Sequence, residues 1–241
     1  MSWAYERDLA GIVLFAGFFI LYGLEFIIPL IRKRSGHLFL NLGFALVLMG
    51  VNFLFASTTI AFGEWVATRE LGIFNTLQPG TGWMIFWSLI FLDFWAGYLV
   101  HCFLHRFPWL WSIHSIHHSD DMVDVTTTFR QHPAETMIRI VFQLSGMAML
   151  GIPVWALMLY LTISTINAQI EHANIRIPDQ VDKLLQYIIV TPNMHKVHHS
   201  SRQLETDSNY SNIFSFWDRM FFTYRALANY AVIDYGLDYM K

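Results

Sequence analysis

Ten of the eleven histidines form three clusters and two single positions in the middle and C-terminal parts of the chain. The clusters have the sequences HCFLH, HSIHH and HKVHH, and the single residues lie between the second and third clusters. Neutral imidazole is the commonest metal-ligating side chain near pH 7. The pattern therefore indicates a metal site, with candidate ligands His101, His105, His114, His117, His118, His132, His172, His195, His198 and His199.

The spacing inside the clusters predicts two metal ions. On a helix, His101 and His105 would emerge from one face on consecutive turns. In each HxxHH cluster the offsets correspond to about 300° and 400° of rotation, so the three rings lie within roughly a 100° arc and the adjacent pair diverges. One transition-metal ion takes about four to six ligands and must keep a position open for chemistry, so eight to ten imidazoles imply two ions.

Carboxylates are expected around such a site. Neutral imidazoles leave the charge of the metal uncompensated, and a ligating ring usually donates its second N–H to an acceptor. The candidates are Asp93, Glu135, Glu171 and Asp218. Asp93 could instead pair with a basic group, and Asp218 could instead cap a local turn.

Composition indicates a membrane protein. The chain is 55% hydrophobic and only 14% charged, with a mean hydropathy of +0.40. Residues 9–31, 38–62 and 83 to about 104 form apolar stretches that are long enough to cross a hydrocarbon core of about 30 Å as helices. Glu25, in the first stretch, is expected to reach the interface near Arg32, and His37 to be an interfacial residue.

The uncharged stretch 140–170 predicts a helical hairpin that enters and leaves the membrane on one face. It is too long for one untilted span and too short for two, and Gly151 and Pro153 lie at its middle. One long tilted helix is the alternative. That helix would separate His132 from His172 across the membrane, so an intact cluster favours the hairpin.

Basic residues predict the orientation. Thirteen of the fifteen Lys and Arg residues fall on the histidine side of this topology, and only Arg7 and Arg69 fall on the other. The positive-inside rule makes the histidine side cytoplasmic. The net charge of −3 carries no nucleic-acid signal.

The sequence as a whole predicts an all-α integral-membrane protein with three long transmembrane helices, a membrane-embedded helical hairpin and a cytoplasmic helical cap that holds a dinuclear histidine-rich site. We expect a single domain over residues 1–241. Residues 1–82 would form a transmembrane pair with an external loop, and residues 83–241 the histidine-box catalytic region.

Other metal-site classes fit poorly. The sequence contains no Glu-x-x-His tetrapeptide of the soluble carboxylate-bridged di-iron proteins and no HExxH motif of the zincins. Its single cysteine, Cys102, cannot supply a CxxC zinc site. An all-histidine site at a membrane surface remains.

Residues from about 91 to 224 resemble the fatty acid hydroxylase and sterol desaturase superfamily of integral-membrane di-iron oxygenases. The resemblance rests on the order and spacing of DFWAGYLVHCFLHR, HSIHH, QHPAE, EHAN, TPNMHKVHH and DSNYSNIFSFWDRMFFTY. It implies two iron ions, with zinc possible in the isolated protein, and use of O2 to hydroxylate or desaturate a lipid C–H bond. It also implies that the eight box residues are ligands or essential: His101, His105, His114, His117, His118, His195, His198 and His199.

Two positions depart from the family pattern. The family usually has NxG where this chain has Asn209, Tyr210 and Ser211, and usually has glycine at the position of Phe222. Both departures replace glycine at a predicted turn, so the backbone there is expected to differ, although no ligand is lost.

Reduction of O2 requires electrons, and the sequence has no GxGxxG fingerprint and no HPGG motif of a fused cytochrome b5. A separate donor of the ferredoxin or cytochrome b5 type is therefore implied. Lys196, Arg202 and Arg219 could help to dock it, although a solvated surface is the alternative.

Two other functions stay open: a membrane protein that binds or transports metal, and a non-catalytic lipid-binding homologue. Because the chain lacks a C-terminal dilysine or KDEL-like signal, a bacterial cytoplasmic membrane is favoured, and the endoplasmic reticulum is the alternative.

Overall fold

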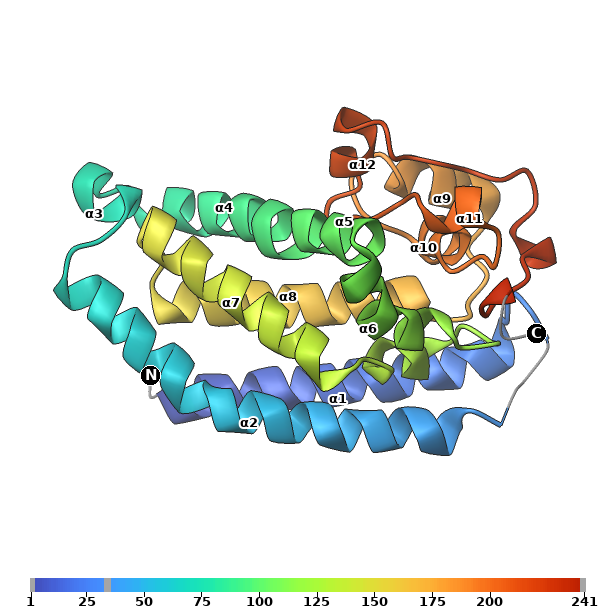
Figure 1. Ribbon diagram of the computed structural model, residues 1–241, viewed down its shortest axis with the longest axis horizontal. Helices are drawn as coiled ribbons and strands as arrows, with labels where there is room; N and C mark the ends of the chain where they lie inside the picture. Colours follow the sequence, from blue (N-terminus) through green and yellow to red (C-terminus); the bar gives the residue numbers. More distant parts are fainter. Residues whose placement is uncertain (1–2, 33–35, 239–241) are drawn as a thin grey trace.

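The computed structural model is mainly helical in the residues that it describes, 3–32 and 36–238, with side chains described from residue 11 onward (Figure 1). Within these residues, extended pairing is limited to isolated bridges such as Pro29 with Ile175. Lys33, Arg34 and Lys241, which the prediction of orientation counted, lie outside the described residues, as does the side chain of Arg7.

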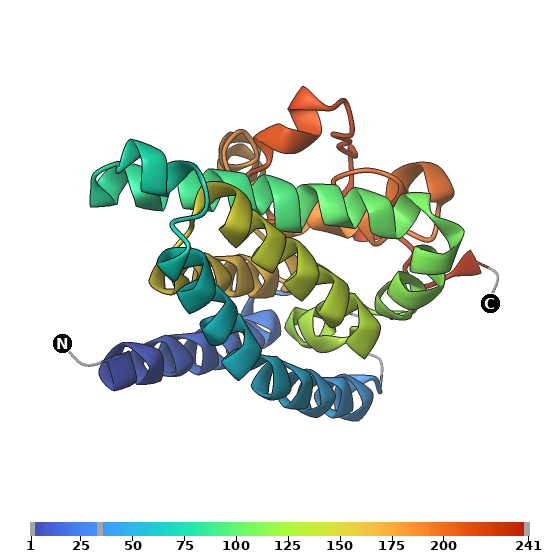
Figure 2. The same cartoon turned by 60° about the vertical axis from the view of Figure 1, so that its left-hand side comes forward.

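The N-terminal half consists of long helices. Helices α1 (Trp3–Ile27) and α2 (Leu38–Thr68) are followed by the short α3 (Ile73–Leu77). Helix α4 (Thr81–Leu92) continues through a π-helical segment, η1 (Asp93–Tyr98), into α5 (Leu99–Arg106), and both views show one continuous rod (Figures 1 and 2).

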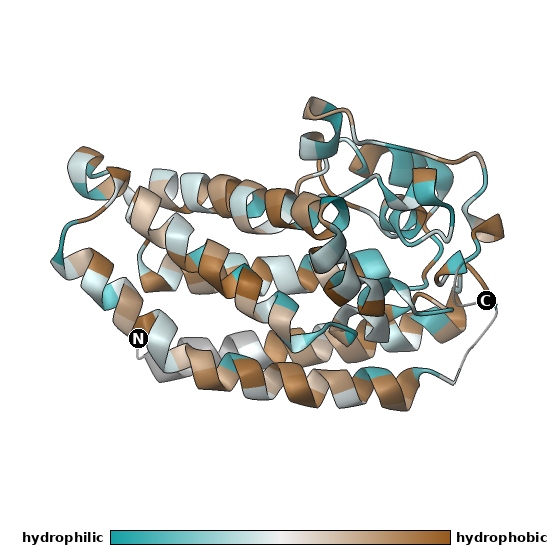
Figure 3. Cartoon of the chain, in the orientation of Figure 1, coloured by the Kyte–Doolittle hydropathy of each residue, from teal (hydrophilic) through white to brown (hydrophobic). Residues whose placement is uncertain are grey.

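The second half begins with α6 (Pro108–His118), the 3-10 turn η2 (Val125–Phe129), and the antiparallel pair α7 (Pro133–Leu150) and α8 (Val154–His172). Short elements follow: α9 (Asp179–Leu185), α10 (Pro192–His198), α11 (Gln203–Thr206), α12 (Phe216–Met220) and η3 (Tyr230–Val232). Helices α9 to α12 gather at one end of the molecule, where polar residues predominate (Figure 3).

Two stretches are long and apolar enough to cross a membrane, judged by length and composition. Leu38–Leu77 has a mean hydropathy of 2.1 and Thr81–Arg106 of 1.6. Only 6% of the most apolar part of the first stretch is buried, unlike the core helix of a soluble protein. The described apolar part of α1, Gly11–Ile27, is shorter, so the predicted three long spans are not confirmed.

The predicted helical hairpin is present as α7 and α8, and both open ends of the pair lie near α6 (Figure 1). Gly151 ends α7 with a left-handed φ of 74°, and Pro153 precedes α8. A Cβ on Gly151 would lie 2.6 Å from the carbonyl oxygen of Leu71, and one on Gly72 would overlap the backbone nitrogen of Gly151. The turn therefore packs backbone against backbone on the loop after α2.

An apolar core joins α4, α7 and α8 and fixes the rod that carries the first histidines. Leu92, Met147 and Leu157 are fully buried there. The core extends to Ile213, so the C-terminal segment packs directly on this rod.

Glu25 is buried at the end of α1 and does not reach outward as predicted. Only 5% of the residue is exposed, and its Oε1 accepts the backbone N–H groups of Val125 and Asn174 at 2.7 and 2.8 Å. The carboxylate thereby ties α1 to the loops that follow α6 and α8, and those two backbone donors explain why a buried acid is tolerated.

His37 is a buried structural residue and not an interfacial one. Its ring lies 2.6 Å from Asp120 and 3.0 Å from Asp124, and its side chain is 7% exposed. Burial lowers the pKa of His37, but the hydrogen bonds and charges of the two aspartates outweigh this and raise it to about 10.

This contact predicts a stability that depends on pH. Because the folded pKa exceeds the ordinary value of 6.5, protonated His37 stabilises the fold fully below about pH 6.5, and the contribution fades toward pH 10. Replacing His37 by Gln should lower the melting temperature clearly at pH 6 and little at pH 10. Thermal unfolding across this range tests it, and a difference that does not change with pH would contradict it.

Candidate metal centre

Nine histidine rings converge in two adjacent groups within the described residues. In each group one ring nitrogen per residue lies within 4.8 Å of all the others. The five-histidine group consists of His101, His105, His114, His118 and His198, and the four-histidine group consists of His117, His172, His195 and His199.

Helical geometry distributes each HxxHH cluster between the two groups. In α6, His114 and His118 are four residues apart and enter the five-histidine group, whereas His117 enters the other group. At α10, His195 and His199 enter the four-histidine group, and His198 enters the five-histidine group. The predicted divergence of adjacent rings thus occurs in both clusters.

Hydrogen bonds at Nδ1 fix which nitrogen faces inward in six of the nine rings. In the four-histidine group, His172 donates to the carbonyl oxygen of Ala168 at 2.7 Å and His117 donates to that of Arg130 at 3.1 Å. A carbonyl oxygen can only accept, so these neutral rings carry their proton on Nδ1 and present a lone pair at Nε2. Those two Nε2 atoms lie only 3.1 Å apart.

The five-histidine group repeats this arrangement. His101 Nδ1 donates to the carbonyl oxygen of Tyr210 at 2.8 Å and His114 Nδ1 donates to Glu135 at 2.9 Å, while their Nε2 atoms face each other at 3.1 Å. Two facing lone pairs repel unless a cation lies between them. Four nitrogens around a tetrahedral ion at about 2.0–2.1 Å lie about 3.3 Å apart, close to these separations, so both groups fit a metal ion.

Buried nitrogens without partners point to the same conclusion. The Nε2 atoms of His105, His118 and His198 have no hydrogen-bond partner among the described residues. A buried polar atom left unpaired is costly, and metal ligation would satisfy all three.

Burial keeps histidine rings on α6 and at α10 neutral. It lowers the pKa of His117, His118, His195 and His199 well below the usual value, and neighbouring histidines lower it further. Burial likewise lowers the pKa of His198, to about 3. Neutral imidazole is the form that binds metal.

Of the four predicted carboxylates, the structure brings two to the histidines. Glu135 accepts from His114 and also binds Arg139. Glu171 lies 3.8 Å from His195 Nε2, beyond hydrogen-bond distance, and its other carboxylate oxygen is buried without a partner.

Asp93 and Asp218 do not contact the histidine rings in the hydrogen bonds found. Asp93 accepts the backbone N–H groups of Ile213 and Phe214 and the indole N–H of Trp217, all at 3.0 Å. Asp218 accepts backbone N–H groups of the same C-terminal segment. In the described part of the chain neither carboxylate forms an ion pair with a basic group. Both bind backbone N–H groups of residues 210–214 instead.

His132 lies outside both groups. Its Nδ1 accepts the backbone N–H of Ala134 at 3.1 Å and caps the start of α7. The hairpin thus brings His172 to the metal centre and leaves His132 at a helix end.

Lys196 does not form a docking surface, because it is fully buried. Its ammonium group donates to the carbonyl oxygens of His172 and Ala173 at 3.1 and 2.7 Å. The guanidinium of Arg219 lies over the ring of Tyr224, whereas the side chain of Arg202 is 73% exposed.

The acceptors that sequence reasoning missed are backbone carbonyls and one aspartate. His198 donates to Ser208 at 2.7 Å, and His105 Nδ1 lies 3.3 Å from Asp207. No residue type encodes a carbonyl acceptor. The only sequence feature that pointed to these acceptors was the DSNYS segment, residues 207–211, which contains them.

The two departures from the family pattern differ in their backbone. Phe222, at a position where glycine is usual, has a left-handed φ of 60°, a conformation that favours glycine. Ser211, at the other position, is not among the residues with a left-handed φ.

The fold and the two histidine groups define a helical protein with a buried histidine-rich metal centre, and comparison with known proteins identifies its family. The fatty acid hydroxylase family model matches residues 85–223, which is more than half of the chain, and the chain belongs to this family.

Curated relatives include an ornithine lipid hydroxylase of Rhizobium tropici, 27% identical over 215 residues, covering 86% of this chain and 63% of the relative. Alkylglycerol monooxygenases of Caenorhabditis elegans and Danio rerio are 28% and 31% identical, covering 72% and 63% of this chain. The chain spans only 33% and 32% of those two relatives. No solved structure matches significantly.

Proposed function

We propose that this protein is a membrane-bound di-iron oxygenase that hydroxylates or desaturates an unactivated C–H bond of a lipid. The observation that carries the proposal is the pair of buried groups in which inward-facing Nε2 lone pairs lie 3.1 Å apart. Family membership and relatives that oxidise lipids support it.

The two histidine groups would each hold one iron ion, and bound iron supplies the activation of O2. Hydroxylation consumes one O2, two electrons and two protons, and it yields the alcohol and water. The chain's own residues hold six of the nine rings through hydrogen bonds at Nδ1, and burial of the groups excludes bulk water from the reaction.

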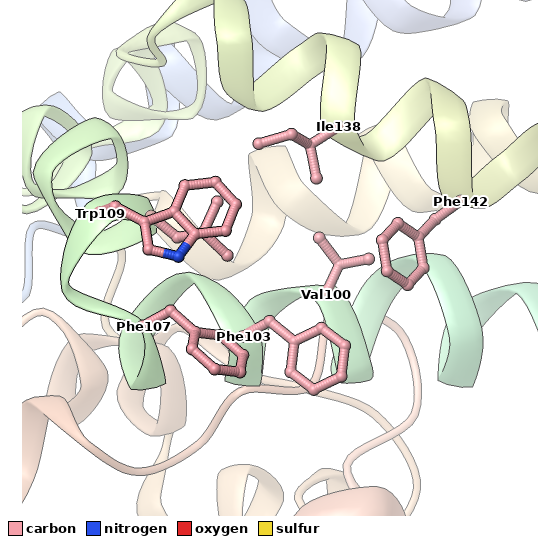
Figure 4. A pocket seen from close by; sticks show the side chains of 7 residues that line it. Val100, Phe103, Phe107, Trp109, Ile138 and Phe142 are labelled. Carbon is pink, nitrogen blue, oxygen red and sulfur yellow. The ribbon is translucent and has the colours of Figure 1, made fainter.

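A lipid substrate fits an apolar cavity beside the rod. It measures about 280 Å³ and lies between α5, the start of α6 and α7 (Figure 4). Its walls include Val100 and Phe103 of α5, the helix that also carries His101 and His105. We propose that it accommodates part of an acyl chain. It is lined by Val100, Phe103, Phe107, Trp109, Leu110, Ile138 and Phe142.

We further propose that residues 1–241 form one domain with the metal groups on the cytoplasmic face of a bacterial membrane, and that a separate ferredoxin or cytochrome b5 supplies the electrons. The distribution of basic residues supports this orientation. Without a flavin or nicotinamide fingerprint in the sequence, an external donor is the simplest source of electrons.

An isotope experiment tests the function. Full-length protein loaded with iron in lipid vesicles, with reduced ferredoxin and 18O2, should convert a lipid of its source membrane to an 18O-labelled alcohol or to an alkene. Protein without iron is the control. Neither product in any source lipid would contradict the proposal and favour a metal-binding or lipid-binding protein.

A further inference from the structure

One short loop orients most of the five-histidine group. We call residues 207–214 the acceptor loop. Three of its members face Nδ1 atoms of this group: the Ser208 carbonyl toward His198, the Tyr210 carbonyl toward His101, and Asp207 toward His105. The four-histidine group draws its acceptors from elsewhere, at Arg130 and Ala168.

The carboxylate of Asp218 holds this loop in place. Its two oxygens accept the backbone N–H groups of Tyr210 at 2.7 Å and Ser211 at 3.0 Å, and the Thr223 hydroxyl donates to it at 2.7 Å. Asp218 is fully buried. Only a carboxylate offers two acceptor oxygens without a donor, which matches two adjacent backbone N–H groups.

Tyr210 connects this carboxylate to a ligand. Its backbone N–H binds Asp218 and its carbonyl oxygen accepts from His101. A shift of the loop at Asp218 would therefore misalign the carbonyl groups that fix the ring orientation of His101 and His198. Asp93 holds the far end of the loop and leaves the end near the ligands to Asp218.

We propose that Asp218 is a positioning residue for the five-histidine group and not for the four-histidine group. It acts through the acceptor loop and does not touch the metal. This inference rests on the proposed function only in requiring that both groups bind metal.

The test compares Asp218→Asn with wild type in metal titrations of the full chain. The amide keeps one acceptor oxygen, so one of the two backbone bonds is lost. We expect the affinity for one of two bound Co²⁺ ions to fall about 10- to 100-fold, the usual effect of losing such support, with the other affinity unchanged.

Two further backgrounds assign the ion. In a His172→Ala background, which leaves the five-histidine group, Asp218→Asn should weaken the remaining ion. In a background with both His101→Ala and His114→Ala, which leaves three rings in the five-histidine group, it should leave the four-histidine ion unaffected. Asp182→Asn is the matched control, because Asp182 is also buried but binds the side chains of Gln186 and Asn193.

The outcomes separate this inference from the proposed function. Wild-type protein with fewer than two ions per chain would contradict the two-metal function. Two wild-type ions that Asp218→Asn weakens equally, or not at all, would overturn the positioning role. If Asp218→Asn does not fold, Thr223→Val removes one hydroxyl bond to the carboxylate and should weaken the same ion by a smaller factor.

Discussion

Replacing His172 by Ala is expected to empty the four-histidine group, leave about one metal ion per chain and abolish lipid oxidation. Its Nε2 lies 3.1 Å from those of His117 and His195 and 3.2 Å from that of His199. Losing this central ligand leaves three nitrogens, too few for a closed tetrahedral set. Metal analysis of protein purified without added zinc measures the change.

His132→Ala is the matched control, since the sequence made both single histidines candidate ligands. His132 only caps α7, so both ions should remain. The free energy of unfolding should fall by about 1 kcal/mol, the usual cost of losing a helix cap, and the melting temperature should fall with it. Loss of an ion from this variant, or two ions in His172→Ala, would contradict the ligand sets.

Replacing Glu135 by Gln is expected to weaken the ion of the five-histidine group about 10- to 100-fold and to lower activity accordingly. Fully buried Glu135 binds His114 through one oxygen and Arg139 through the other. Glutamine retains only one acceptor oxygen, so one of these two partners loses its bond. Competition with a chelator measures the affinity.

The control for this variant is Glu64→Gln, which changes an exposed carboxylate on α2 and should leave both affinities unchanged. The four-histidine ion should also be unaffected by Glu135→Gln. Equal weakening of both ions would show that Glu135 acts through global stability and not through His114.

Local patterns in the sequence predicted the helical hairpin and the division of the ligands. Ring directions follow from helical rotation over three or four residues, so the splitting of His117 from its neighbours in α6 needed no tertiary information. The turn of the hairpin at Gly151 and Pro153 was likewise encoded locally, because these residues end one helix and begin the next.

Contacts between distant segments decided the rest. Burial of Glu25, His37 and Lys196 depends on partners far away in the chain, so a reading of local polarity assigned all three to exposed positions. Asp218 and Tyr210 show the same limit. A backbone carbonyl has no residue identity, so only the packed loop reveals which carbonyl receives a ligand's proton. The sequence by itself determined a histidine set suited to two ions, whereas the tertiary structure decided that His172 joins it, that His132 does not, and which groups accept hydrogen bonds from the rings.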